Sequence, residues 1–367
     1  MQLVAYGAQD IYLTGNPQIT FFKVVYRRHT NFAMEAVEQT MSGNQTTSGK
    51  STVTISRNGD LVGRVYLQNV VTGALADTSA ANGGNMIIDN VVVEIGGQQI
   101  DKHYGHWMEV WAELTEPNPT GANVAGSSSA DGTPYQRMAL GGGITAATPT
   151  SATYFTPLPF WFCRNPGLAL PLIALQYHEV KLQIQFSAVK HATQQDVSVW
   201  ADYIYLDTDE RRRFAQVSHE YLIEQVQHQA FSASTTHDLT FNHPVKELVW
   251  TGARDSGTLI PAALSGTFAV KLNGHERFAA RNFTYFTRAQ IWQHHTGYGG
   301  CSGTSDNIGV YSFALKPEEH QPSGTCNFSR IDNAQLVLGA SQAIEVYAVN
   351  YNVLRVMSGM GGLAYSN

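Results

Sequence analysis

Residues 12–33 read YLTGNPQITFFKVVYRRHTNFA, and this stretch determines how the start of the fold is interpreted. Its first part has turn chemistry, because Gly15 tolerates unusual backbone dihedrals and Pro17 keeps the preceding residue out of the helical region. The run from Ile19 to Tyr26 is apolar and aromatic, and it is too short and too branched to predict a long helix. A compact cationic group at 27–29 follows. The stretch carries no chemistry by itself, so its value is that of a signature.

Strand patterns continue from there along the whole chain. Asn58-Gly59 and Asn273-Gly274 are typical hairpin turns between such runs. Many short strands separated by Gly and Pro turns indicate a sandwich, a barrel or a jelly roll. The strands predicted in the first half are 32–39, 51–56, 65–71, 86–95, 98–103, 177–186 and 197–206, and those in the second half are 220–229, 237–242, 245–250, 267–272, 310–315 and 343–354.

Few segments favour a helix. Residues 105–115 place Trp107, Val110, Trp111 and Leu114 at helical spacing on one apolar face. Residues 117–151 are rich in Gly, Ser, Thr and Ala and predict a long loop, with one helical turn near 135–140. In the segment DTDERRR at 207–213, acidic residues precede arginines, which predicts a short connecting helix capped by Asp207 or Thr208. An anion site on its arginines is the less favoured alternative.

Three features occur twice in the same order. A histidine leads into a strand at His29 and again at His219. The hairpin VEIGGQQI at 93–100 has its counterpart in VKLNGHERF at 270–278, and VWADYIYL at 199–206 has its counterpart in VYAVNYNVL at 346–354. The spacing between copies shrinks along the chain, because the first copy contains the helix at 105–115 and the long loop. The sequence therefore predicts two similar β-domains in tandem.

Length and composition agree with this organisation. A chain of 367 residues suits two domains, and only 14% of its residues are charged, against about 25% in average soluble proteins. Low charge with 33 Gly and many aromatics indicates an all-β protein that buries surface against neighbours, although a secreted β-protein with neutral loops has a similar composition. The net charge of −6 argues against nucleic-acid binding. Three widely spaced cysteines and an N-terminus without signal-peptide features indicate synthesis in a reducing compartment.

Candidate chemical sites are weak. His103, His106 and Glu109 lie close in sequence, but no second His follows at the spacing of a helical zinc motif, so a polar or buried hydrogen-bonding role is favoured over metal binding. Asn-x-Ser/Thr sequons occur at Asn44, Asn282 and Asn327, and without a leader they are more simply chance triplets. No motif of a nucleophile elbow, a phosphate-binding loop or a metalloprotease occurs. We therefore expect no enzyme activity, cofactor or metal.

Two aromatic patches could in principle stack on sugars. These are Phe160–Phe162 and Tyr285–Phe286, and filling of a core or an interface is the favoured role for both.

The opening stretch resembles the N-terminal segment of the major capsid proteins of large nucleocytoplasmic DNA viruses, most of all those of algal viruses. Further blocks resemble the same family: IGGQQIDKHYGHW (95–107), NPGLALPLIALQYHEVKL (165–182), YLDTDERRRFAQVSHEYLIEQ (205–225), YSFALKPEEHQPSGTCNFSRIDNA (311–334) and YAVNYNVLRVMSGMGGLAYSN (347–367). The resemblance implies two tandem eight-stranded jelly rolls with short helices in loops. It also implies homotrimeric, pseudo-hexameric capsomers that tile an icosahedral shell.

These expectations assign the chain as follows: residues 1–26 form a segment on the inner face of the capsid, 27–206 the first jelly roll, 207–216 a connector and 217–367 the second jelly roll. On the resemblance, the inner-face and assembly candidates are Asn16, Pro17, Phe21, Phe22, Lys23, Arg27 and Arg28. The expected partners are other copies of the chain, minor capsid proteins and the surface of an internal viral membrane, with no sequence-specific nucleic-acid binding. The expected location is the virion, after assembly in host cytoplasm.

The chain is short for this family, because many relatives carry longer loops, particularly in the second jelly roll. The rival hypothesis is a carbohydrate-binding or spike-like protein on the same fold, because fold alone does not fix function. A glycan-processing enzyme is a third hypothesis and would need a pocket with two acidic residues.

Overall fold

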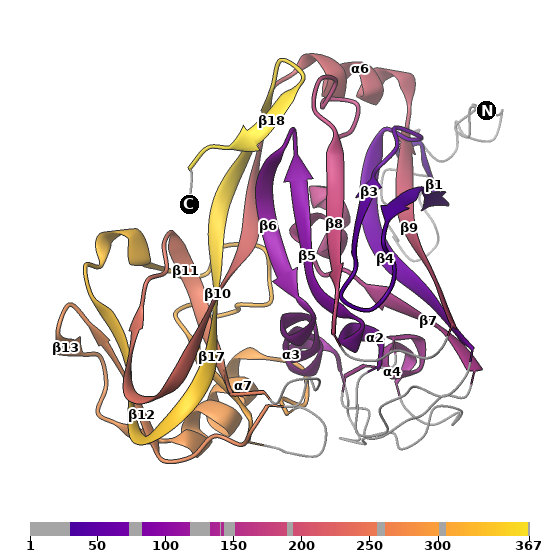
Figure 1. The fold of residues 1–367 in the computed structure, drawn as a ribbon. Helices are drawn as coiled ribbons and strands as arrows, with labels where there is room; N and C mark the ends of the chain where they lie inside the picture. Colours follow the sequence, from indigo (N-terminus) through magenta and orange to yellow (C-terminus); the bar gives the residue numbers. More distant parts are fainter. Residues whose placement is uncertain are drawn as a thin grey trace, which may run out of the picture.

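The computed structural model describes residues 30–72, 83–117, 133–139, 141–142, 151–188, 194–254, 261–300 and 306–365. Two β-units stand side by side, and short helices gather mainly at one end of both (Figure 1). Three sheets of four, five and nine strands make up these units. The all-β prediction is thus confirmed. None of the helices described has both the length and the apolarity needed to cross a membrane.

The first half, residues 32–206, pairs a four-stranded sheet with a five-stranded sheet. The four-stranded sheet has the order β1 (Phe32–Gln39), β9 (Gln194–Leu206), β4 (Leu61–Thr72), β7 (Ser151–Pro157). The five-stranded sheet has the order β2 (Met41–Gly43), β3 (Lys50–Thr54), β8 (Val180–Phe186), β5 (Ile88–Ile95), β6 (Gln98–Tyr104). Strand β8 alternates buried and half-buried residues, as expected for one face against a core. Its inward residues pack with those of the other sheet in one cluster.

The second half, residues 219–363, is one curled nine-stranded sheet. Two long strands run through it, β10 (His219–Leu239) and β17 (Ala334–Met357), and they pair with each other along most of their length. The remaining strands are β11 (Pro244–Gly252), β12 (Thr267–Leu272), β13 (His275–Glu276), β14 (Arg281–Asn282), β15 (Ile308–Ser312), β16 (Cys326–Asn327) and β18 (Met360–Leu363). Register shifts between Phe231 and Thr236 mark where the ladder bends.

The predicted duplication is confirmed by strand order and register. The order β1-β9-β4-β7 of the first half is repeated as β10-β17-β11-β15 in the second. The sequence alignment of the two copies matches Val199 with Val346 and His29 with His219. By the same offsets, Val37 corresponds to Gln227 and Ala201 to Ala348. The structure pairs Val37 with Ala201 and Gln227 with Ala348 across neighbouring strands. Even the irregularity after Val62 in β4 has its counterpart after Val245 in β11.

The two halves differ in how the strands are joined. Strands β8 and β9 are separate in the first half, whereas their counterparts are the two ends of β17. The sequence patterns at 220–229 and 237–242 were predicted as separate strands, and this was wrong, because the first and half of the second lie within the continuous strand β10. A polar, poorly alternating middle, residues 230–236, hid the continuity.

The predicted helices form. Helix α3 spans Gly105–Thr115, α4 spans Pro134–Ala139 and α6 spans Thr208–Gln216. The side chain of Asp207 accepts a hydrogen bond from the amide of Thr208, as predicted for a cap. Several strand boundaries were wrong: α2 (Gly83–Met86) occupies the predicted start of β5, and β17 begins at Ala334, nine residues before the predicted strand 343–354.

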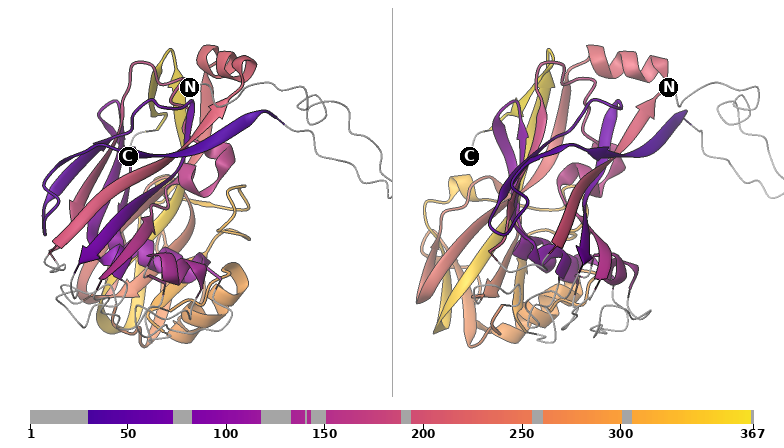
Figure 2. Two further views of the ribbon diagram at one scale, coloured as in Figure 1. Left: turned by 90° about the vertical axis from the view of Figure 1, so that its right-hand side faces the viewer. Right: turned by 45° about the vertical axis from the view of Figure 1, so that its right-hand side comes forward.

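The two ends of the molecule differ in structure. Helix α6 crosses one end, near β18, whereas α2, α3 and α4 of the first half and α7 (Gln290–His294) of the second lie at the opposite end (Figure 2). A further short helix, α5 (Trp161–Arg164), precedes the turn that leads to β8. The two ends of the molecule along the strand direction are therefore different. The chain enters the described region at the α6 end.

Candidate functional site

The main structural site of the molecule is the seam between its two halves, which is apolar at its centre. From the first half, Trp107, Val110, Trp111 and Leu114 of α3 enter the seam. They pack on the outer face of the second half, on β10, β11, β15 and β17, with Tyr347 and Val349 in contact with them in one buried cluster. The Trp107 and Tyr347 ring centroids lie 5.0 Å apart. The apolar helix face that was predicted from the sequence thus packs against the other half.

The second half also completes the C-terminal end of α3. The amide of Gly297 donates to the carbonyl of Leu114 over 2.8 Å, and the amide of Gly299 donates to that of Glu113 over 2.9 Å. The Thr296 hydroxyl donates to the carbonyl of Thr115 over 3.0 Å. Helix ends leave carbonyls without intrahelical partners, so segment 295–299 supplies a cap from another part of the chain. A β-carbon on Gly297 would lie 2.3 Å from the Glu113 oxygen, which explains the glycine.

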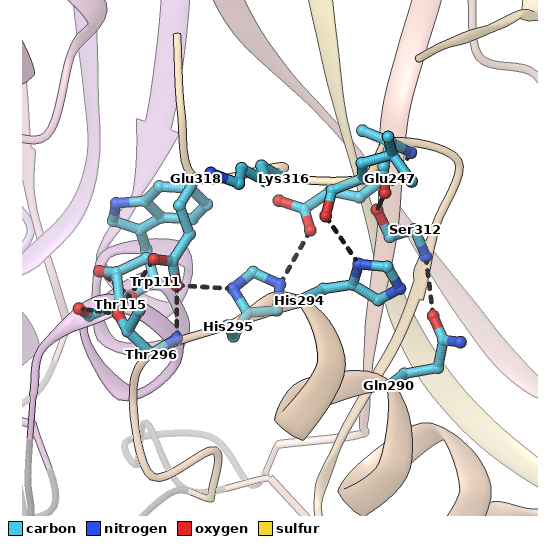
Figure 3. A network of polar contacts seen from close by, with 12 residues as sticks. Trp111, Thr115, Glu247, Gln290, His294, His295, Thr296, Ser312, Lys316 and Glu318 are labelled. Carbon is cyan, nitrogen blue, oxygen red and sulfur yellow. Dashed lines mark hydrogen bonds and ion pairs between the residues drawn. The ribbon is translucent and has the colours of Figure 1, made fainter. Parts of the chain in front are cut away.

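His295 sits beside this cap between two carboxylates (Figure 3). Its Nε2 lies 2.9 Å from Glu247 Oε2, and its Nδ1 lies 3.1 Å from Glu318 Oε1. Burial opposes a charge on the ring, but Glu247 and Glu318 outweigh burial and raise the pKa of His295 to about 9. The imidazolium therefore persists at neutral pH and joins α7 to β11 and to the loop after β15.

A second ionic group lies on the same seam. Glu224 of β10 is 2.8 Å from both Arg164 of α5 and Lys246 of β11, and His320 approaches it at 3.5 Å. Burial tends to raise the pKa of Glu224, but the cations around it lower it to about 2. A cavity of about 230 Å³ opens beside this group and is lined by Trp161, Arg164, Asn165, Pro166, Leu168, Glu224, Glu318 and His320. Two acids, Glu224 and Glu318, line this cavity, and each is paired with basic side chains: Glu224 with Arg164 and Lys246, and Glu318 with His295.

A third buried acid, Glu345 of β17, joins residues of the second half. Arg254 Nε lies 2.7 Å from its Oε1, and both His228 Nε2 and the Tyr347 hydroxyl lie 3.1 Å from its Oε2. Burial tends to raise its pKa, but His228, His106 and Arg254 outweigh burial and lower it. The sequence analysis did not identify the buried acids Glu224, Glu247 and Glu345 as members of ionic groups. The available signal was charge inside strands, as in PVKELVW at 244–250.

The candidate metal residues point to different partners. His103 pairs with Asp101 over 2.8 Å, His106 contacts the Thr251 hydroxyl over 3.0 Å, and Glu109 accepts from Asn85 over 2.7 Å. All are buried, so the favoured hydrogen-bonding interpretation is confirmed. In the described ranges no group of three or more His, Cys, Asp or Glu is placed to hold a metal ion.

The aromatic patches are parts of the interior. Phe160, Trp161 and Phe162 are at most 2% exposed, and Phe286 is fully buried. The sugar-stacking alternative is wrong for 160–162, and the core role is confirmed. Of the arginines at 211–213, Arg211 pairs with Asp60 over 2.9 Å.

The three sequon asparagines are exposed and share one conformation. The side-chain oxygen of Asn44 accepts from the amide and the hydroxyl of Thr46, and that of Asn282 does the same with Thr284. In the third sequon the oxygen of Asn327 accepts from the amide of the serine two residues on. The inner-face candidates Asn16, Pro17, Phe21, Phe22, Lys23, Arg27 and Arg28 lie outside the described residues.

Comparisons with known proteins agree across the whole chain. Residues 20–207 match the family model described as "Major capsid protein N-terminus", and residues 210–258 and 264–362 match "Large eukaryotic DNA virus major capsid protein". The chain is 53% identical to the major capsid protein of Pyramimonas orientalis virus and 42% identical to that of Paramecium bursaria Chlorella virus 1, over 100% of this chain and 99% of each relative.

Solved structures extend this similarity to three dimensions. The capsid model of Paramecium bursaria Chlorella virus 1 contains a chain that matches with a TM-score of 0.81 and 36% identity, over 95% of this chain and 100% of that one. The Faustovirus major capsid protein matches with a TM-score of 0.70 and 12% identity, over 93% of each chain, which shows a shared fold.

Proposed function

This chain belongs to the major capsid protein family of large eukaryotic DNA viruses, and from that premise we propose that it builds the viral shell as homotrimeric, pseudo-hexameric capsomers. Its function is structural: it is a capsid component of the virion, and it has the double jelly-roll fold of its structural relatives. The observation that carries the trimer is the repeated strand order of the two halves. Three chains then supply six similar units, which suit a hexagonal lattice site.

The domain assignment is part of this proposal. We assign 27–206 and 217–367 to the two jelly rolls and 207–216 to the connector. Support comes from the sheets, which use residues 32–206 and 219–363 separately, and from helix α6 between them. The first-half core nevertheless includes Ile223, Leu354 and Val356 of the second half, so the units are joined through a shared core.

We further propose that residues 1–26 line the inner face of the shell. The cations Lys23, Arg27 and Arg28 would face minor capsid proteins or the anionic surface of an internal membrane. The chain enters the described region at the α6 end, which is then the inner end (Figure 2). Reversal of charge at Arg27 and Arg28 is expected to reduce the yield of complete particles, and intact particles would contradict the assignment.

We propose assembly in host cytoplasm and no enzymatic activity. The described cysteines Cys163 and Cys326 are unpaired thiols, which fits a reducing compartment. The carbohydrate-binding rival loses its main support, because Trp161 is buried. Asn44, Asn282 and Asn327 remain proposals for glycan attachment, to be checked by mass spectrometry of virion protein.

Light scattering on a sizing column tests the trimer directly. The purified protein is expected to elute with the mass of three chains and to form arrays visible by electron microscopy. A monodisperse single-chain species at high concentration, with no higher assembly, would contradict the proposal.

A further inference from the structure

We propose that successive copies of this chain join head to tail through the same two kinds of surface that its own halves use at the seam. The inference rests on the proposed homotrimer and names the surfaces that would build it. One surface is the outer face of the four-stranded sheet in the first half, here called the sheet face. The other is the β13–β14 edge of the second half, residues 275–282, here called the edge.

The seam inside one chain supplies the template. The outer face of the second half contributes Val226, Val249, Ile308, Tyr347 and Val349 to the buried seam cluster. Strand β6 of the first half lies against this face beside α3: the Gln225 side chain donates to the Ile100 carbonyl, and the Val226 amide donates to Asp101 over 3.1 Å. A sheet face of one unit thus receives the edge strand and the following helix of another.

The strand register identifies, for each of these face positions of the second half, the corresponding residue in the first half. Tyr66 opposes Trp200 as Val249 opposes Tyr347, and Ala36 opposes Asp202 as Val226 opposes Val349. Phe155 of β7 takes the place of Ile308 of β15 by the same pairing. The sheet face therefore consists of Ala36, Tyr66, Phe155, Trp200 and Asp202.

These counterparts remain accessible in the single chain. Ala36 is exposed, and Tyr66, Phe155, Trp200 and Asp202 are partly exposed. The rings of Tyr66 and Phe155 meet edge to face with centroids 5.9 Å apart. Aromatic side chains on an accessible sheet face are typical of protein–protein interfaces. The equivalent positions of the second half are buried, because another unit covers them.

The edge is the counterpart of β6 by the same logic. The hairpin pair Ile95–Gln98 corresponds to Leu272–His275, so β13 stands where β6 stands in the first half. Strand β6 is covered by β10, whereas His275, Glu276, Arg277, Arg281 and Asn282 of the edge are all exposed. Each unit thus has both surfaces, and one of each kind is left without a partner unit within the described residues.

The two unpaired surfaces also have opposite net charge. The edge has two exposed arginines, Arg277 and Arg281, against one exposed acid, Glu276, and Arg281 lies over the Tyr285 ring at 4.2 Å. The sheet face has Asp202 and Glu38, which opposes Trp200, against Arg64, whose charge interacts with that of Asp202. Complementary charges favour encounter in one orientation and disfavour contact of like surfaces. A second copy of this chain therefore fits each surface.

A contact between two different surfaces is heterologous, and it forms either a closed ring or an open filament. In the proposed homotrimer this contact closes a ring, in which the seam inside each chain alternates with the contact between chains.

Two blocking variants and their mixture test the arrangement. Trp200→Glu blocks the sheet face, and the double variant Arg277→Glu/Arg281→Glu blocks the edge. Each variant alone is expected to fall from the mass of three chains to that of one. An equal mixture is expected to give a two-chain species, because one intact surface of each kind remains. Two variants that stay single when mixed, or that stay trimeric alone, would overturn the inference.

Controls separate this inference from the proposed trimer. Tyr177→Glu changes a side chain that is 75% exposed outside both surfaces, and it should keep the mass of three chains. If the unaltered protein is monomeric, the homotrimer itself fails. If the unaltered protein is trimeric and both blocking variants are also trimeric, only the surfaces are wrong.

Hydroxyl-radical labelling gives a readout that needs no folded variant. Tyr66 and Trp200 are expected to be protected in the unaltered trimer and to become reactive when it is diluted to single chains, with Tyr177 reactive in both. Reactivity in the trimer would overturn the inference. Protection in single chains as well would assign the face to another segment of the same chain and would also overturn it.

Discussion

At the scale of single residues, the interior holds charges that are tolerated because each has a partner. His295 has no exposed side-chain surface, yet it carries a proton between Glu247 and Glu318. Lys246 is fully buried, and its charge is balanced by Glu224. Burial lowers the pKa of Lys246, and Glu224 opposes that effect. An ion in a protein interior costs several kcal/mol unless its partner is well placed, so these positions should be sensitive to both pH and substitution.

Because His295 is protonated between two carboxylates, the free energy of unfolding should fall as the pH becomes alkaline. A histidine whose pKa is raised from 6.5 to about 9 contributes stability that is fully present below about pH 6.5 and is lost as pH rises through 9. The contribution is about 3 kcal/mol, most of which should disappear between pH 7 and pH 9.5. Urea unfolding over this range measures the loss. His295→Gln should flatten the slope, and an equal slope in both proteins would contradict the assignment.

Loss of the buried ion pairs of Glu224 should destabilise the protein more than loss of an exposed ion pair. Glu224→Gln leaves Lys246 and Arg164 without a balancing charge, and we expect a loss of about 3–5 kcal/mol in the free energy of unfolding. The matched control is Glu319→Gln, which breaks a pair with Lys316 in which both side chains are more than half exposed. That change should cost less than about 1 kcal/mol. Comparable losses in the two variants would show that the seam does not depend on this charge.

At the scale of elements, α3 shows what sequence can and cannot predict. Its helical spacing identified the face with Trp107 and Trp111, because apolar periodicity depends only on local sequence. The opposite face, with His106 and Glu109, is polar, and its local pattern does not distinguish a solvent-facing position from the buried one that the structure shows. Its partners come from residues such as Thr251, far away in the chain, and no local pattern reports them.

Two tryptophans should respond very differently to the same change. Trp111 of α3 is 7% exposed in the seam, so Trp111→Ala should reduce the free energy of unfolding by about 3–5 kcal/mol. Trp292 of α7 is 82% exposed, and Trp292→Ala should change it by less than about 0.5 kcal/mol. Thermal and urea denaturation measure both. A larger loss for Trp292 than for Trp111 would mean that the seam contributes little to stability.

At the scale of the whole molecule, the duplication was visible in sequence because turn residues and strand patterns repeat in order. The register that relates the halves was already contained in the aligned blocks 199–206 and 346–354. What sequence could not show is that β17 serves several cores. Its residues Leu354 and Val356 pack in the first half, Leu336 and Val346 in the second, and Tyr347 in the seam.

The shared strand predicts that the halves unfold together. Leu354→Ala should cost about 2–5 kcal/mol, because it leaves a cavity in the first-half core while its backbone belongs to the second-half sheet. Hydrogen exchange should accelerate to a similar degree in β8 and in β12. Acceleration confined to β12 and its neighbours would show that the halves are independent.

The position of β17 also matters while the protein is being made. The ribosome releases the N-terminal half first, and at that stage the core of this half lacks Ile223, Leu354 and Val356 and the end of α3 lacks its cap. Only when residues 334–357 emerge are the three clusters complete. A chain whose translation stops early therefore cannot reach the native state, so the growing particle discriminates between finished and unfinished chains without a separate inspection step.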